Sequence, residues 1–129
     1  MALDVNAYAD YGNLDFVTTD TFAETRQVFV ELWADGQLHI PQTEASTKVL
    51  GVLRDFARKG DCPVVRRTGT AYVTAGSDLN VGDYVTTDTK GHARLAKTGE
   101  IVLGEVLDAG VKSGQEAKIN LISQAAKVA

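Results

Sequence analysis

Carboxylates are the commonest groups in this chain that could do acid–base chemistry, since 17 residues are Asp or Glu. General acid–base catalysis needs two such groups facing each other, with at least one pKa shifted by burial. No pair stands out by its spacing. Asp78, Asp83 and Asp88 lie in or near expected turns, where Asp is favoured because its side chain accepts hydrogen bonds from backbone amides. We therefore interpret these three as turn residues, not catalytic ones.

Nucleophiles are also scarce. Cys62 is the single cysteine, which excludes an intrachain disulfide and favours a small buried apolar role. No serine has the Gly-x-Ser-x-Gly context of an exposed nucleophile. Gly110–Gly114 contains Lys-Ser but lacks the Gly-x-x-x-x-Gly-Lys-Ser/Thr spacing of a phosphate loop, so it predicts a β-turn. The serines considered are Ser46, Ser77, Ser113 and Ser123.

Metal ligands are limited to two histidines, His39 and His92, which belong to different expected hairpins. There is no His-x-His or His-x-x-x-His pair of the kind that binds zinc. We therefore expect no catalytic residue, no metal, no cofactor and no enzymatic activity. A deep polar cleft in which either histidine meets buried carboxylates would contradict this expectation.

One alternative with chemistry is a carrier domain bearing a lipoyl or biotinyl group. Val81–Val85 followed by Lys90 at a hairpin tip resembles such domains, which are pseudo-symmetric β-barrels with a modified lysine at a tight turn. Here Gly91 follows the lysine, and no Asp-Lys-Ala or Met-Lys-Met triplet surrounds it.

The N-terminus combines aromatic and acidic residues. The first 20 residues hold four Asp and no Lys or Arg, so they account for the whole net charge of −4. Residues 1–12 are therefore interpreted as an arm that orders against a neighbouring protein, with Tyr supplying contact area and Asp supplying charge. A place in the core of the first repeat is the alternative: it is favoured for Tyr8, which matches Tyr72 in the repeat, and it is an equal alternative for Tyr11. The candidate binding residues are Asp4, Tyr8, Asp10 and Tyr11.

Charge and hydropathy exclude other partners. A nucleic-acid surface needs a basic patch, and beyond residue 20 acidic and basic residues balance. No apolar run is long enough to span a bilayer. The N-terminus lacks the basic start and apolar stretch of a signal peptide, so synthesis in a cytoplasm is expected.

The chain carries an internal repeat. Asp15–Thr21 recurs as Asp83–Thr89 with six of seven positions identical, and Val49–Leu53 matches Val102–Leu107. We therefore expect two tandem copies, at about 7–67 and 71–122, forming one pseudo-symmetric domain. The predicted division is an arm at 1–12, a β domain at 13–122 and a tail at 123–129.

Strands are expected almost throughout, because Val-, Thr- and aromatic-rich segments alternate with Gly-bearing turns. The resulting fold class is mainly β: a small β-barrel or sandwich-like domain. A helical turn or two could form at 43–52, and residues 123–129 could form a fraying helix or be disordered. The expected strands are 26–33, 37–40, 64–65, 71–73, 83–87, 92–96, 101–107 and 116–122. The expected core is Val28, Val30, Leu32, Leu50, Val52, Val65, Val73, Val85, Leu95, Leu103, Val106, Ile119 and Leu121.

The second copy resembles the phage capsid decoration proteins, also called cement or head-stabilising proteins. The resemblance covers roughly residues 49–122 and consists of glycines and alternating apolar positions: Gly69-x-Ala71-x-Val73, Leu79-x-Val81-Gly82-Asp83-x-Val85, Val102-x-Gly104-x-Val106-Leu107 and Ala117-x-Ile119-x-Leu121. The first copy departs from it, because Asn13-Leu14-Asp15-Phe16 lacks the Gly of Gly82-Asp83 and a longer insertion follows.

The resemblance implies a non-enzymatic, β-rich homotrimer on the outer surface of the virion. There it binds the major capsid protein of the expanded shell and bridges capsomers. Alternatives are another virion structural protein, such as a head fibre base or tail module, and the carrier or ligand-binding β-barrel.

Overall fold

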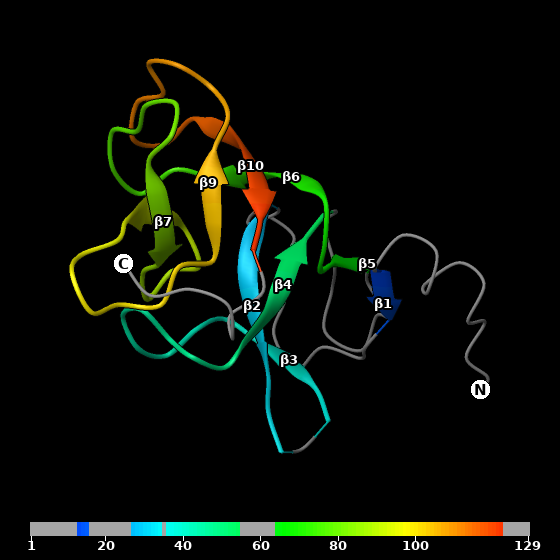
Figure 1. Ribbon diagram of the computed structural model, residues 1–129. Coiled ribbons are helices and arrows are strands. Elements are labelled where there is room, and N and C mark those ends of the chain that lie inside the picture. Colours follow the sequence, from blue (N-terminus) through cyan, green and yellow to red (C-terminus); the bar gives the residue numbers. More distant parts are fainter. Residues whose placement is uncertain (1–12, 16–26, 35, 55–63, 123–129) are drawn as a thin grey trace.

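The computed structural model describes residues 13–15, 27–34, 36–54 and 64–122 (Figure 1). Within these ranges all regular structure is β-strand and there is no helix. The strands are β1 (Asn13–Asp15), β2 (Val28–Leu32), β3 (Leu38–His39), β4 (Val49–Leu53), β5 (Val64–Arg66), β6 (Thr70–Thr74), β7 (Tyr84–Thr87), β8 (Ala93–Leu95), β9 (Gly104–Val106) and β10 (Glu116–Leu121).

The strands form two antiparallel sheets with the same topology. The first has the order β1-β5-β4-β2-β3 and the second the order β6-β10-β9-β7-β8. Adding five to every label of the first order produces the second, so each sheet is built by one half of the chain in the same way. The expected mainly-β, sandwich-like, twofold-repeated fold is thus confirmed. The barrel version is wrong, because the strands form two separate sheets, and an isolated parallel bridge from Ala75 to Ala93, not a strand ladder, joins the edges of the second sheet.

The strand register extends the correspondence between the two sheets to individual residues. Gly51 lies opposite Val30 in β2, and Gly104 lies opposite Val85 in β7. At both glycines a Cβ atom would collide with the neighbouring strand, at 2.3 Å from the Arg66 carbonyl oxygen and 2.2 Å from Ile119 Cγ2. The shared glycine therefore serves the close approach of two strands. We call two residues that occupy the same place in the two sheets counterparts.

One part of the predicted repeat is out of register with the fold. The match of Val49–Leu53 to Val102–Leu107 agrees with the correspondence of β4 and β9. The match of Asp15 to Asp83 is wrong, because Asp15 lies opposite Val64 in β1, the place that Tyr72 takes in β6. The Val-Thr-Thr composition favours a strand wherever it occurs, so identity of such a segment does not fix its place in a sheet.

The expected hairpins are present, and the expected helix is not. Gly36 and Gly91, with φ of 77° and 81°, occupy the β2–β3 and β7–β8 turns. Such positive φ angles favour glycine because it lacks a Cβ. Residues 43–48 form turns and 49–53 form β4, so the helix considered at 43–52 is wrong. Strand propensity of the Val-Leu-Gly-Val-Leu run and its pairing with β2 and β5 outweigh local helix propensity.

The two sheets carry separate apolar clusters on counterpart faces. Val30, Leu53 and Val65 belong to the first cluster, and their counterparts Val85, Val106 and Ile119 belong to the second. Most of the expected core is buried. Leu32, Leu50 and Leu121 are only partly buried, and Leu95 is wrong as a core residue, being 49% exposed at the end of the edge strand β8.

The first sheet joins the second through β2. Phe29, Val49 and Val52 belong to the apolar cluster of the second sheet, and Phe29 is fully buried there. The Phe29 amide donates to the Gly91 carbonyl at 2.8 Å. A Cβ at Gly91 would lie 2.7 Å from the Phe29 carbonyl oxygen, so glycine lets the β7–β8 turn lie directly on β2.

Candidate functional site

The predicted binding residues Asp4, Tyr8, Asp10 and Tyr11 lie outside the described residues. So do Cys62, Ser123, the arm at 1–12 and the tail at 123–129. The structure therefore bears on the remaining candidates, which are the two histidines, the turn aspartates, Lys90 and the Lys-Ser segment.

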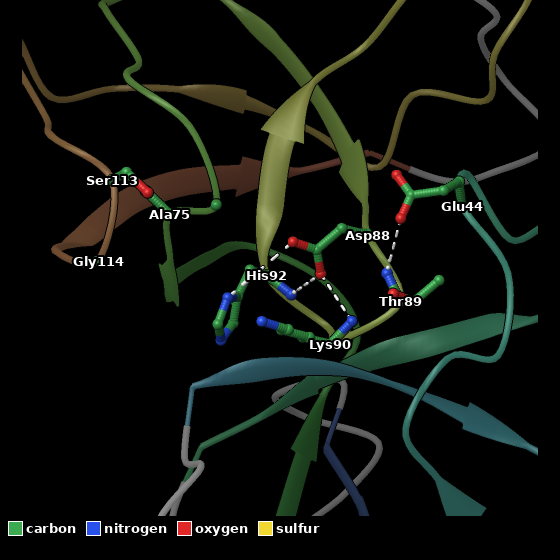
Figure 2. Close-up of a pocket in the computed structure, with 9 residues that line it drawn as sticks. Glu44, Ala75, Asp88, Thr89, Lys90, His92, Ser113 and Gly114 are labelled. Carbon is green, nitrogen blue, oxygen red and sulfur yellow. Dashed lines mark hydrogen bonds and ion pairs between the residues drawn. The ribbon is translucent and has the colours of Figure 1, made fainter.

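A pocket of about 340 Å³ brings several of these candidates together. It is lined by the β7–β8 turn, by Glu44 of the loop 41–48, by Ala75–Gly76 and by Ser113–Gly114 (Figure 2). Asp88 Oδ1 accepts hydrogen bonds from the backbone amides of Lys90 and His92, at 2.8 and 2.9 Å. Asp88 therefore caps its own turn, the role expected from the sequence.

The pocket has the residue types of an acid–base site but not a closed arrangement. His92 Nδ1 lies 4.0 Å from Asp88 Oδ2, beyond hydrogen-bond distance, and both side chains are partly exposed. Ser113 lines the pocket on the side of Ala75 and Gly114 in Figure 2. Lys90 is exposed in the turn with its amide held by Asp88. Nothing here aligns a nucleophile with a base as covalent catalysis requires.

The other turn aspartates also accept hydrogen bonds from backbone amides. Asp83 Oδ2 accepts from the amide of Asn80 at 2.8 Å, and Asp78 Oδ1 accepts from the amide of Ser113 at 3.1 Å. The Lys112 carbonyl accepts from the amide of Gln115 at 3.0 Å, closing a turn. The β-turn predicted for the Lys-Ser segment is confirmed.

Arg94 in β8 joins charges from both halves of the chain. It donates to Glu44 Oε1 at 2.7 Å and, through two nitrogens, to both oxygens of Glu100 at 2.8 and 2.7 Å. The hydrogen bond from Arg94, with a second from the Lys97 amide, lowers the pKa of Glu100 to about 2. The hydrogen bond to Glu100 likewise raises the pKa of Arg94 above its usual value, against the opposing effect of burial.

A second polar cluster lies on the β2–β3 hairpin. Glu31 is 3% exposed and lies opposite His39 in the strand register. Trp33 Nε1 donates to Glu31 Oε1 at 2.8 Å, and Ser46 donates its hydroxyl to Glu31 Oε2. The Trp33 ring stacks on the His39 ring, with centroids 3.6 Å apart and planes 13° apart.

The structure thus places His39 beside a buried carboxylate. This is one part of the arrangement that would contradict the expectation of no catalysis; the other part is a deep polar cleft. The carboxylate is bonded to an indole and a hydroxyl rather than facing a substrate-sized space, and neither Glu31 nor His39 lines the pocket in Figure 2. Sequence reasoning missed this cluster. The one feature of the sequence that indicates the cluster is the alternation of Glu31 and Trp33 with apolar residues in a strand, which places both side chains on the same face.

Within the described residues no group of three His, Cys, Asp or Glu side chains could hold a metal ion. The same part of the chain contains no helix long and apolar enough to cross a membrane.

Comparisons with known proteins find a similar fold among solved structures. No family model matches the chain, and no curated protein matches it. Among solved structures, the chain is similar to the crystal structure titled head fiber gp8.5 N base in bacteriophage phi29. The TM-score is 0.63 and the identity 21%, over 85% of this chain and 92% of that one. Because the alignment covers most of both chains, the likeness extends to most of the fold.

Proposed function

We propose that this chain is a structural protein of a bacteriophage virion that binds the outer surface of the head as a decoration protein. The observation that carries the virion part of the proposal is the similarity of most of the fold to a phage head fibre base, at a TM-score of 0.63. The decoration role itself rests on the resemblance of residues 49–122 to decoration proteins. We propose no enzymatic activity, cofactor or nucleic-acid partner.

In this proposal the partner is the major capsid protein, and the chain acts as a homotrimer that bridges capsomers of the expanded shell. Each copy binds with modest affinity, and a trimer that engages several subunits together gains avidity. A rigid β body with short, hydrogen-bonded turns suits this role, because it can hold neighbouring capsid subunits at a fixed distance.

The test is binding to purified heads of the encoding phage. We expect the protein to co-sediment saturably with expanded heads and weakly with unexpanded ones, because bridging sites form when the shell expands. Absence of binding to expanded heads would refute the proposal. Intact-mass measurement of the protein from infected cells tests the carrier alternative, since a modification at Lys90 would support it.

The base of a head fibre is a second candidate, and the similarity to the phi29 protein favours it specifically. Thermal release of DNA from heads separates the two. A decoration protein should raise the release temperature when it is added back to depleted heads, whereas a fibre base should leave that temperature unchanged. Cryo-electron microscopy of the same heads would locate the protein in either case.

A further inference from the structure

The β2–β3 hairpin displays an aromatic ring that is both exposed and fixed. Trp33 is 36% exposed, yet its Nε1 is bonded to Glu31 at 2.8 Å and one face of its ring is covered by His39. Its backbone amide donates to Gln37 at 3.1 Å, and its carbonyl accepts from Gly36 at 2.9 Å. A ring fixed in this way loses little conformational entropy when a partner covers it.

The support beneath the ring is built from two elements. Glu31 comes from β2, and Ser46, which donates to its second oxygen, comes from the loop 41–48. The Ser46 oxygen in turn accepts from the Lys48 amide at 3.1 Å. The same loop is attached to the second sheet, where the Ala45 amide donates to Thr87 at 2.9 Å. The ring is therefore anchored to the body of the molecule.

The fold itself does not require this arrangement. The counterparts of Glu31 and His39 in the second sheet are Thr86 and Arg94, which lie opposite each other in the same register. The same backbone thus forms with a threonine and an arginine in place of the glutamate and the histidine. This difference between counterparts points to a role for the cluster beyond folding.

The chemistry of the cluster favours a cation. The face of an indole carries a negative potential that attracts ammonium and guanidinium groups, and Trp is the strongest such ring. The Glu31 carboxylate adds negative charge directly beside the ring, and because it is buried its field is weakly screened by salt. A planar guanidinium can also stack on the ring, which an ammonium cannot.

We propose that Trp33 and Glu31 form a binding site for an arginine side chain, and that the arginine belongs to the capsid protein. The identity of the partner rests on the proposed function, whereas the cation site does not. Trp is the residue type most enriched among the side chains that dominate binding energy at protein interfaces. In Figure 1 the hairpin extends away from the second sheet, where it can reach a neighbouring protein.

The cation site is tested on the full chain in solution. Trp33 is the only tryptophan, so a single indole N–H resonance reports on the site. At pH 8, N-acetyl-arginine amide should shift that resonance saturably. The citrulline analogue, which is isosteric and uncharged, should not. Glu31→Gln, which keeps an acceptor for the indole, should weaken the arginine response. Equal shifts with arginine and citrulline would overturn the site.

The capsid contact is tested on expanded heads. Trp33→Ala should lower the affinity by at least about tenfold, as expected for a dominant interface residue, and Trp33→Phe by less. Tyr72→Ala, which removes a more exposed ring from the second sheet, is the matched control and should bind as wild type. Wild-type affinity of a folded Trp33→Ala would overturn the contact. Failure of the wild type to bind heads would refute the proposed function but leave the arginine titration to decide the cation site.

Discussion

Arg94 links the two halves of the chain by ion pairs, because its guanidinium contacts Glu44 of the first half and Glu100 of the second. The two-nitrogen bond to Glu100 fixes the geometry of the pair. The Glu44 side chain is half exposed, so that contact adds little by itself. The Glu100 contact is the one with a measurable consequence.

Acid should weaken the fold through Glu100. Its folded-state pKa is about 2, below the usual 4.5, so its contribution to the free energy of unfolding is present above about 4.5 and is lost as the pH falls toward about 2. Urea unfolding at several pH values should show wild type and Glu100→Gln differing most near neutral pH and converging in acid. A difference that does not change with pH would contradict the assignment.

Phe29 should be the most costly side chain to remove where the sheets meet. It is 1% exposed and belongs to the apolar cluster of the second sheet. Phe29→Ala should lower the free energy of unfolding by about 3–5 kcal/mol, through lost burial and a cavity. Val81→Ala, at a 60% exposed position, should change it by less than about 0.5 kcal/mol. A loss below about 1 kcal/mol for Phe29→Ala would mean that this junction is not tightly packed.

At the scale of elements, the two counterpart glycines set the distance between neighbouring strands. Gly104→Ala would place a Cβ 2.2 Å from Ile119 Cγ2, and we expect overpacking of this kind to cost about 1–3 kcal/mol. Ile119→Ala removes the colliding atom. In a double-mutant cycle the two substitutions should therefore destabilise less together than the sum of their separate effects. Strict additivity would show that the strands move apart freely.

Much of the element pattern could be predicted from the sequence. The segments Arg26–Trp33 and Glu116–Ile122 alternate or concentrate strand-forming residues, and both contain strands. The turns at Gly36 and Gly91 have the glycine that a positive φ favours. Sheet order was less accessible. The Asp15–Thr21 match aligned segments by local strand propensity, whereas register depends on partners far away in the chain.

The candidate site was harder to predict than the fold. The aspartates of turns were interpretable, because their role is local and spans a few residues. The Glu31–Trp33–His39–Ser46 cluster depends on cross-strand pairing and on a loop that returns to cover β2. Spacing along the chain carries no information about that return, so a buried carboxylate was indistinguishable from a solvated one.

At the scale of the whole molecule, the shared cluster should make the two sheets unfold together. Three residues of the first sheet, Phe29, Val49 and Val52, are part of the apolar core of the second sheet. Unfolding one sheet would therefore expose the core of the other, and we expect a single cooperative transition. Trp33 fluorescence reports on the first sheet and far-ultraviolet circular dichroism on both. The two curves should coincide in urea. A fluorescence transition that precedes the dichroism change would show independent units.

Assembly is the second prediction at this scale. Sedimentation equilibrium should give three times the chain mass of 13.8 kDa. Deletion of residues 1–12 should lower affinity for expanded heads and leave the urea midpoint within experimental error. If binding survives the deletion unchanged, the arm assignment is wrong, while the body of the protein remains a candidate for the contact.

The matching strand orders have a consequence for the history of the chain. A polypeptide of half this length that associated with itself would have had two identical partners, and any change would have altered both at once. Joining the copies in one gene removes that constraint. Phe29 could then become an apolar junction while its counterpart Tyr84 stayed partly exposed, and Glu31 could acquire an indole while Thr86 did not. The two sheets therefore share one backbone arrangement but differ in the side chains at paired positions, which two identical halves could not do.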